Sequence, residues 1–191
     1  MKRKLNLHAV IPVSTVNGPG QRMVIFFQGC ARGCQNCFNP ATHPFTEALA
    51  APVEELCREA QELGVEGLTI SGGEPFSQPE ALLELLKRAR EDYRLSTVVY
   101  TGYRLEELRG RERLREALGY VDVLVDGPYD DTRPERTTLA RGSTNQRFQF
   151  LTARYGIDDF YMPARLEVKI AGDGVVTATG FGALPGATGG I

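Results

Sequence analysis

Three cysteines stand close together in the sequence, at Cys30, Cys34 and Cys37, with the spacing C-x3-C-x2-C. Three thiolates on one short loop can converge on a single iron–sulfur cluster or on a single metal ion. A cubane [4Fe–4S] cluster typically takes four cysteines, one for each iron. Because only three cysteines are local here, one iron would keep an open coordination position for a substrate. The spacing therefore favours an iron–sulfur cluster that also binds a small molecule.

Other uses of these thiols remain open at this point. Zinc would need a fourth ligand such as His43, although C-x3-C-x2-C is an unusual spacing for zinc sites. A structural disulfide is poorly supported, because the triplet is odd in number and the sequence looks cytosolic. The remaining cysteine, Cys57, could be a fourth cluster ligand. It falls on the apolar stripe of a predicted helix, however, and we expect it to be a buried structural residue.

A second motif, S-G-G-E-P at residues 71–75, follows a predicted strand. Gly72 and Gly73 have no side chains, so a ligand can approach the backbone closely there. Glu74 adds a negative charge to the same turn, and Pro75 follows it. By itself, this motif is equally consistent with an ordinary turn between a strand and a loop.

The pattern of apolar residues predicts strands that alternate with helices. The predicted strands are 4–11, 23–27, 65–70, 96–100 and 121–125, and the predicted helices are 52–63, 77–89 and 105–118. Strand and helix alternate three times, which is typical of βαβ units and a parallel sheet. Three units are too few for a closed eight-fold barrel, so we predict an α/β fold built as an open partial (β/α) barrel. Catalytic groups in such sheets lie at the carboxyl ends of the strands, where both motifs fall.

The C-terminal part of the chain shows a different pattern. Residues 127–146 are polar and rich in turn formers, and they predict a long loop. Segments 165–170 and 175–179, separated by a glycine-rich turn, predict a β-hairpin. The Gly/Ala-rich end is expected to be frayed. We therefore expect a main domain at 1–160, and a hairpin with a flexible tail at 161–191.

Composition and charge narrow the class of protein. The 22 Lys and Arg nearly balance the 24 Asp and Glu, and a net charge of −2 argues against a nucleic-acid-binding protein. No run of about 18 apolar residues is present, so the sequence predicts no transmembrane helix. The N-terminus lacks the apolar core of a secretory signal. We expect a soluble protein of the cytoplasm.

The two motifs together closely resemble those of the radical S-adenosylmethionine superfamily. By this resemblance, Cys30, Cys34 and Cys37 would be the cluster ligands, and residues 72–75 would bind the methionyl amino group of S-adenosylmethionine. Residues 18–22, with the sequence G-P-G-Q-R, look like the G-P-G-x-R segment of glycyl-radical-enzyme activases.

The sequence around the third cysteine narrows the resemblance. Most of the superfamily has an aromatic residue just before that cysteine, whereas this chain has Asn36 there and Phe38 and Asn39 after the cysteine. This variant is similar to the activating proteins of anaerobic ribonucleotide reductases. Further segments that resemble those proteins, in the same order, are T-G-Y at 101–103, D-V-L-V-D-G-P at 122–128 and G-S-T-N-Q-R at 142–147. The predicted hairpin has no counterpart there that we can place.

The resemblance implies a radical mechanism. The open iron of a [4Fe–4S] cluster would chelate S-adenosylmethionine, and a low-potential electron would break its sulfonium bond and yield a 5′-deoxyadenosyl radical. That radical would take a hydrogen atom from a backbone glycine of a glycyl-radical enzyme, of the anaerobic ribonucleotide reductase type. A flavodoxin or a ferredoxin-type protein would supply the electron.

The resemblance and the strand ends together suggest which residues contact S-adenosylmethionine. Besides the cysteines, we expect contacts from Gly72, Gly73, Glu74, Pro75, Thr101, Asp126, Ser143 and Asn145. Glu74 would hold the cationic amino group. Asp126 could orient a substrate or a cation, with a solvated turn as the alternative. Ser143, Asn145 and Gln146 offer neutral hydrogen bonds suited to a ribose or a partner loop, or equally to a self-capped turn. Arg22 could pair with an anion or simply flank its strand.

Two competing functions remain at the sequence level. One is a radical enzyme of the same superfamily that acts on a small molecule, as in a 7-carboxy-7-deazaguanine synthase-like reaction. The other is a non-enzymatic iron–sulfur or zinc protein. The sequence has no large insertion that could enclose a substrate, which favours an open site suited to a protein substrate.

Overall fold

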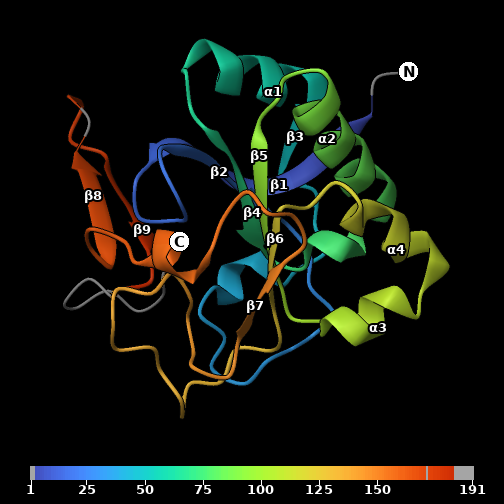
Figure 1. The fold of residues 1–191 in the computed structure, drawn as a ribbon. Coiled ribbons are helices and arrows are strands. Elements are labelled where there is room, and N and C mark those ends of the chain that lie inside the picture. The colour runs from blue at the N-terminus through green and yellow to red at the C-terminus, as the bar shows by residue number, and fades with distance from the viewer. Residues whose placement is uncertain (1–2, 171, 183–191) are drawn as a thin grey trace.

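A mixed sheet of seven strands forms the centre of the fold in the computed structural model, which describes residues 3–170 and 172–182 (Figure 1). The strands of this sheet are β1 (Lys4–Ser14), β2 (Arg22–Phe27), β3 (Leu49–Pro52), β4 (Gly67–Gly72), β5 (Ser96–Thr101), β6 (Val123–Asp126) and β7 (Arg147–Phe150), in the spatial order β3-β1-β2-β4-β5-β6-β7. The four central strands β2, β4, β5 and β6 are parallel to one another. The flanking strands β1, β3 and β7 pair antiparallel with their neighbours.

Helices cover one face of this sheet (Figure 1). They are α1 (Val53–Glu62), α2 (Pro79–Glu91), α3 (Leu105–Arg109) and α4 (Glu112–Leu118), and short 3-10 turns occur at Pro40–Thr42, Pro75–Ser77 and Ile157–Phe160. Helix α1 buries Val53, Leu56, Cys57 and Ala60, whose spacing places them on one side of a helix. Together with the apolar side chains of the strands, these helices form the main hydrophobic core.

The opposite face of the sheet is covered by the irregular chain between β6 and the C-terminal hairpin. Leu139, Phe160 and Met162 from this segment pack against Val98 and Val125 of the sheet in a second, smaller core. The hairpin of β8 (Leu166–Ile170) and β9 (Val176–Gly180) forms a separate two-stranded sheet beside it. Helices therefore cover one face of the sheet, and loops cover the other face and leave room for a pocket.

The structure confirms the α/β class, the three βαβ units from β2 to β6, and the C-terminal hairpin. It differs from the sequence prediction in two details. The predicted helix 105–118 is divided in two, because the chain turns at Gly110 and Arg111 between α3 and α4. Strands β3 and β7 were not predicted; both are only four residues long and pair at the edges of the sheet.

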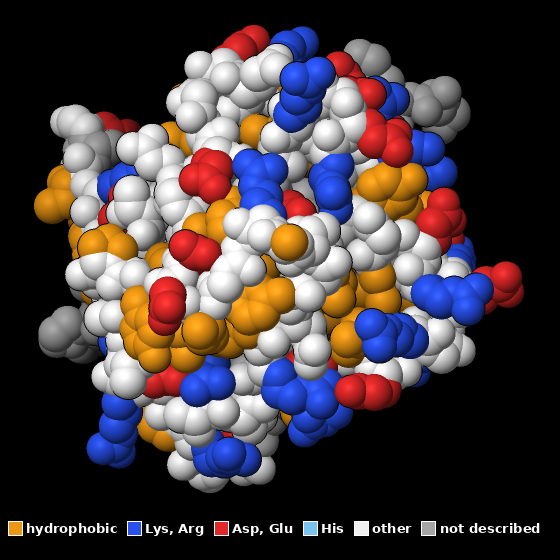
Figure 2. All heavy atoms as spheres, viewed as in Figure 1, with side chains coloured by type: hydrophobic (Ala, Val, Ile, Leu, Met, Phe, Trp, Pro, Cys, Tyr) orange, Lys and Arg blue, Asp and Glu red, His pale blue; other side chains and the backbone are white. Residues whose placement is uncertain are grey.

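The surface carries charges of both signs. Figure 2 shows Lys and Arg side chains interspersed with Asp and Glu on the face in view, in agreement with the net charge of −2. Within residues 3–170 and 172–182, no helix has the length and apolar character needed to cross a membrane.

Candidate functional site

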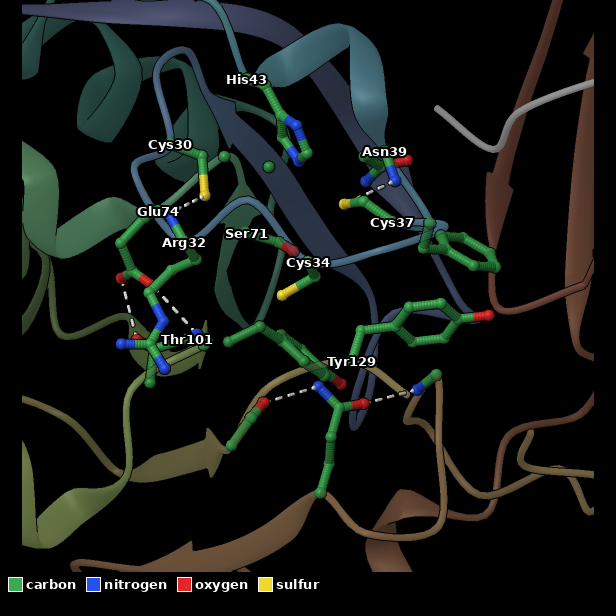
Figure 3. Close-up of a pocket in the computed structure, with 18 of the residues that line it drawn as sticks. Cys30, Arg32, Cys34, Cys37, Asn39, His43, Ser71, Glu74, Thr101 and Tyr129 are labelled. Atoms are coloured by element: carbon green, nitrogen blue, oxygen red, sulfur yellow. Dashed lines mark hydrogen bonds between the residues drawn. The ribbon is translucent and has the colours of Figure 1, made fainter. Parts of the chain in front are cut away.

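Both predicted motifs meet in one pocket at the carboxyl edge of the parallel strands. The cysteine loop leaves β2 at Phe27, and the S-G-G-E-P turn leaves β4 beside it, because β2 and β4 are parallel neighbours. The pocket is lined by all three cysteines of the loop, by Gly72, Gly73 and Glu74, and by Thr101 at the end of β5 (Figure 3). Residues that lie far apart in the sequence are therefore brought together as the strand-end argument predicted.

Backbone hydrogen bonds fix the cysteine loop to the glycine turn. The Gly73 N–H donates to Phe27 O at 2.8 Å, and the Glu74 N–H donates to Gly29 O at 3.0 Å. The loop is closed on itself by the Cys30 N–H, which donates to His43 O at 3.0 Å. Because both segments are tied to the end of β2, the thiols and the turn hold a fixed relation to each other.

The two glycines of the turn are required by the chain's own backbone. A Cβ at Gly73 would lie 2.4 Å from Gly29 O, and one at Gly72 would lie 2.4 Å from Phe27 N. Gly72 also has a φ of +103°, which side chains rarely adopt. From the sequence, we expected these glycines to let a ligand approach the backbone. The structure shows that their first role is to let the cysteine loop pack directly on the turn.

The three thiols face a common space, and each is only partly buried (Figure 3). Cys30 Sγ accepts a hydrogen bond from the Arg32 N–H, and Cys37 Sγ accepts one from the Asn39 N–H, both at 3.4 Å. Burial raises the pKa of Cys30 and Cys37, and these hydrogen bonds oppose the effect by stabilising the thiolates. Thiolates are the form that binds iron.

The three thiols line one pocket without being arranged around a single metal ion. Across the described part of the chain, no group of three Cys, His, Asp or Glu side chains is arranged to hold one metal ion. His43 lines the pocket but does not complete a compact Cys3His set with the thiols. A cubane cluster takes each cysteine on a different iron, so its ligands surround a larger space. Three half-buried thiols around one pocket satisfy that requirement.

Glu74 is almost completely buried in the wall of the pocket, with 1% of its surface exposed. Its carboxylate accepts hydrogen bonds from Thr101 Oγ1 at 2.8 Å, from the Gly102 N–H at 2.9 Å and from the Phe76 N–H at 3.1 Å. Burial raises the pKa of Glu74 to about 7, against the effect of these donors and of the nearby Arg32 guanidinium. The hydrogen bond from its hydroxyl makes Thr101 a residue that positions the Glu74 carboxylate.

Comparison with known proteins identifies the family. Residues 16–149 match the family described as a 4Fe-4S single cluster domain. The chain is 32% identical over 151 residues to an anaerobic ribonucleoside-triphosphate reductase-activating protein of Pasteurella multocida, covering 74% of this chain and 95% of that protein. The protein of the same name from Escherichia coli K12 is 31% identical over 153 residues, covering 74% and 96%. The one from Enterobacteria phage T4 is 32% identical over 149 residues, covering 75% and 92%.

The chain belongs to the family of anaerobic ribonucleoside-triphosphate reductase-activating proteins. This confirms the resemblance drawn from the cysteine spacing and the glycine turn. It also confirms the expectation of an activating enzyme whose cofactors are a [4Fe–4S] cluster and S-adenosylmethionine.

Four of the expected contact residues lie outside the pocket of this activating protein: Pro75, Asp126, Ser143 and Asn145. Asp126 is fully buried, accepts a hydrogen bond from the Leu105 N–H at 2.6 Å, and pairs with Arg147. It thereby fixes the start of α3 to β6 and β7. Pro75 is buried at the start of a 3-10 turn.

Ser143 and Asn145 order the loop after β6. Ser143 Oγ accepts from the Asp130 N–H at 3.2 Å, and Asn145 Nδ2 donates to Pro128 O at 2.7 Å. This loop does reach the pocket, through Gly127, Tyr129, Gly142 and Gln146. Of the three polar side chains that the sequence pointed to in this loop, Gln146 lines the pocket, whereas Ser143 and Asn145 do not.

Several pocket residues were missed by the sequence argument, including Arg32, Phe38, Tyr100, Tyr129 and Phe181. The edge-to-face contact of Phe38 with Tyr129, with ring centroids 5.9 Å apart, joins the cysteine loop to the loop after β6. The sequence did contain a signal for Phe38, because the aromatic residue follows Cys37 in this chain whereas most of the superfamily has one before the third cysteine. Phe181 gave no signal, because it follows the hairpin in a segment that was expected to be frayed.

Arg22 of the G-P-G-Q-R segment lies at the opposite edge of the sheet, where β2 begins. Its fully buried guanidinium donates to Leu68 O at 2.7 Å, Thr69 Oγ1 at 2.8 Å and Ser96 Oγ at 2.9 Å. It ties together the starts of three parallel strands, which neither of the two sequence interpretations described. Cys57 is buried in the main core, as predicted, and burial raises its pKa to about 12.

Proposed function

We propose that this protein activates an anaerobic ribonucleoside-triphosphate reductase by a radical reaction of S-adenosylmethionine. The observation that carries the proposal is the single pocket in which three thiols and the buried Glu74 meet at the carboxyl edge of the sheet. The names of the relatives support the choice of partner, because they are activating proteins of that reductase.

Cys30, Cys34 and Cys37 would hold the cluster by three of its irons and leave the fourth iron to the amino and carboxylate groups of S-adenosylmethionine. When bound and reduced, these cofactors supply a 5′-deoxyadenosyl radical that can take a hydrogen atom from a glycine of the partner. The chain's own contribution is position. The hydrogen bonds from Gly73 and Glu74 to the end of β2 hold the cysteine loop and the glycine turn at a fixed distance from each other.

Glu74 would face the cationic amino group from its buried position. A charge-assisted contact of this kind is stronger in a site shielded from water, and the ligand's positive charge favours the ionised carboxylate. Thr101 and the Gly102 N–H hold that carboxylate in place. Asp126, Ser143 and Asn145 would act on the cofactor through the loop that they order, whose residues Gly127 and Gln146 line the pocket.

We propose that the parallel strands act as an open partial (β/α) barrel of the radical S-adenosylmethionine type, with residues 1–160 as the catalytic body and 161–191 as an appended unit. The electron would come from a flavodoxin or a ferredoxin-type protein in the cytoplasm.

The test is a reconstitution without oxygen. The protein is loaded with iron and sulfide, reduced, and given S-adenosylmethionine, with and without an anaerobic ribonucleotide reductase. We expect 5′-deoxyadenosine and methionine, and a glycyl radical when the reductase is present. Cys34→Ala is the matched inactive control. If the intact four-iron cluster forms but no 5′-deoxyadenosine appears, the proposed chemistry is wrong. If 5′-deoxyadenosine forms but the reductase acquires no radical, the proposed partner is wrong.

A further inference from the structure

The C-terminal hairpin lies outside the residues that match the family. The family match ends at residue 149, whereas β8 and β9 lie at 166–180. The alignment with the Pasteurella multocida protein covers 95% of that protein but only 74% of this chain. About a quarter of this chain is therefore additional to that relative, and the hairpin belongs to a part with no family match.

The hairpin is attached to the body of the protein by polar contacts, one of which is buried. Asn17 Nδ2 donates to Thr179 Oγ1 at 2.9 Å. Glu167 accepts from Ser14 Oγ and from the Thr15 N–H, both at 3.0 Å. An element tied down in this way can position a side chain in a site.

Phe181, directly after β9, is the residue that the hairpin brings to the pocket. Its N–H donates to Arg165 O at 2.7 Å, and its own carbonyl accepts from Arg165 Nη2 at 2.6 Å. Its ring packs on the ring of Tyr100 of β5, with centroids 5.6 Å apart and planes inclined by 40°. The hydroxyl of Tyr100 donates in turn to Ala140 O at 2.7 Å, which anchors the two rings on the face of the sheet opposite the helices.

We propose that Phe181 and Tyr100 form the wall against which the adenine ring of S-adenosylmethionine packs. The inference rests on the proposed function, which places the methionyl end of the ligand at the thiols. The nucleoside end must then contact other walls of the same pocket, and an adenine ring packs well on aromatic faces. Phe181 is only partly buried, so part of its ring remains accessible to a ligand.

The other aromatic pair of the pocket is less suited to this role. Phe38 follows Cys37 directly in the sequence, and the Tyr129 ring contacts the Phe38 ring with centroids 5.9 Å apart. Phe38 and Tyr129 therefore lie on the cluster side. The planes of the two rings are inclined by 67° in an edge-to-face contact, so the rings pack on each other and do not form one flat wall.

The first test measures the affinity of the cluster-loaded protein for S-adenosylmethionine by equilibrium dialysis. Phe181→Ala should raise Kd about tenfold, and Phe181→Leu should also raise it, because leucine keeps an apolar side chain but loses the ring. Val176→Ala, at an exposed position of the same hairpin, is the matched control and should bind as the wild type does. Iron content should be equal in all four proteins. Equal affinity in Phe181→Ala and the wild type would overturn the proposal.

The second test uses fluorescence, because the chain contains no tryptophan. Phe181→Trp places a single reporter at the proposed wall, and Val176→Trp places one elsewhere on the hairpin. S-adenosylmethionine should change the emission of the first protein and leave that of the second unchanged, and 5′-deoxyadenosine should have the same effect because it lacks only the methionyl end. An unchanged emission of Phe181→Trp would refute the assignment. A wild-type protein that binds no S-adenosylmethionine would instead refute the proposed function.

Discussion

Gly73→Ala should separate the stability of the cysteine loop from that of the rest of the fold. The new Cβ would lie 2.4 Å from Gly29 O and 2.9 Å from Thr42 O, well inside the usual contact distance of about 3.5 Å. Overpacking of this kind costs about 1–3 kcal/mol. Displacement of the loop would also weaken the bonds from Gly73 and Glu74 to the end of β2, at about 1 kcal/mol each. The smaller entropy of the unfolded chain offsets about 0.5–1 kcal/mol.

The expected loss in the free energy of unfolding is therefore about 2–4 kcal/mol. It should be accompanied by a lower iron content after reconstitution, because the loop that moves carries the thiols. Urea denaturation and iron analysis measure the two effects. Gly156→Ala is the control, because a Cβ there meets no atom within 4 Å, and it should leave both quantities nearly unchanged. A Gly73→Ala protein with wild-type stability and iron content would refute the close-packing argument.

Three further substitutions test other parts of the structure. Arg22→Met should lower the free energy of unfolding, measured by urea denaturation, by about 3 kcal/mol or more, because it leaves buried carbonyls without donors. Iron analysis of the folded fraction should show the cluster content of the wild type. Loss of iron without loss of stability would contradict this expectation. Burial raises the pKa of Glu74 to about 7 from its ordinary value of 4.5, so between those pH values the folded protein holds a proton that the unfolded chain has released. The stability of the cluster-free protein should fall by about 3 kcal/mol as the pH rises through that window, and Glu74→Gln should remove this slope; equal slopes in the two proteins would show the burial argument to be wrong. Cys57→Ala should cost about 1 kcal/mol of stability and keep the iron content of the wild type, unlike Cys34→Ala; loss of iron would make Cys57 a ligand.

The parts of the site that the sequence predicted correctly depend on local spacing and on strand direction. The three cysteines occupy one short loop, so their proximity follows from chain length alone. The glycine turn meets that loop because parallel neighbouring strands end at the same edge of a sheet. Neither conclusion needs a long-range contact to be known in advance.

The parts that were missed depend on contacts between distant segments. Asp126 stands at a strand end, as expected, but the partners of its carboxylate are Leu105 and Arg147, which lie on separate elements. Strand β7 is recognisable only through its antiparallel pairing with β6. Phe181 reaches the pocket because the hairpin docks on the N-terminal segment around Asn17, a contact that no local pattern reveals.

The central claim is that Cys30, Cys34 and Cys37 hold a cluster with one iron left free for S-adenosylmethionine. The most direct test is the electron paramagnetic resonance spectrum of the reduced, reconstituted protein before and after S-adenosylmethionine is added. We expect the signal of a four-iron cluster whose g values change when the ligand binds. A four-iron signal that S-adenosylmethionine leaves unchanged would contradict it.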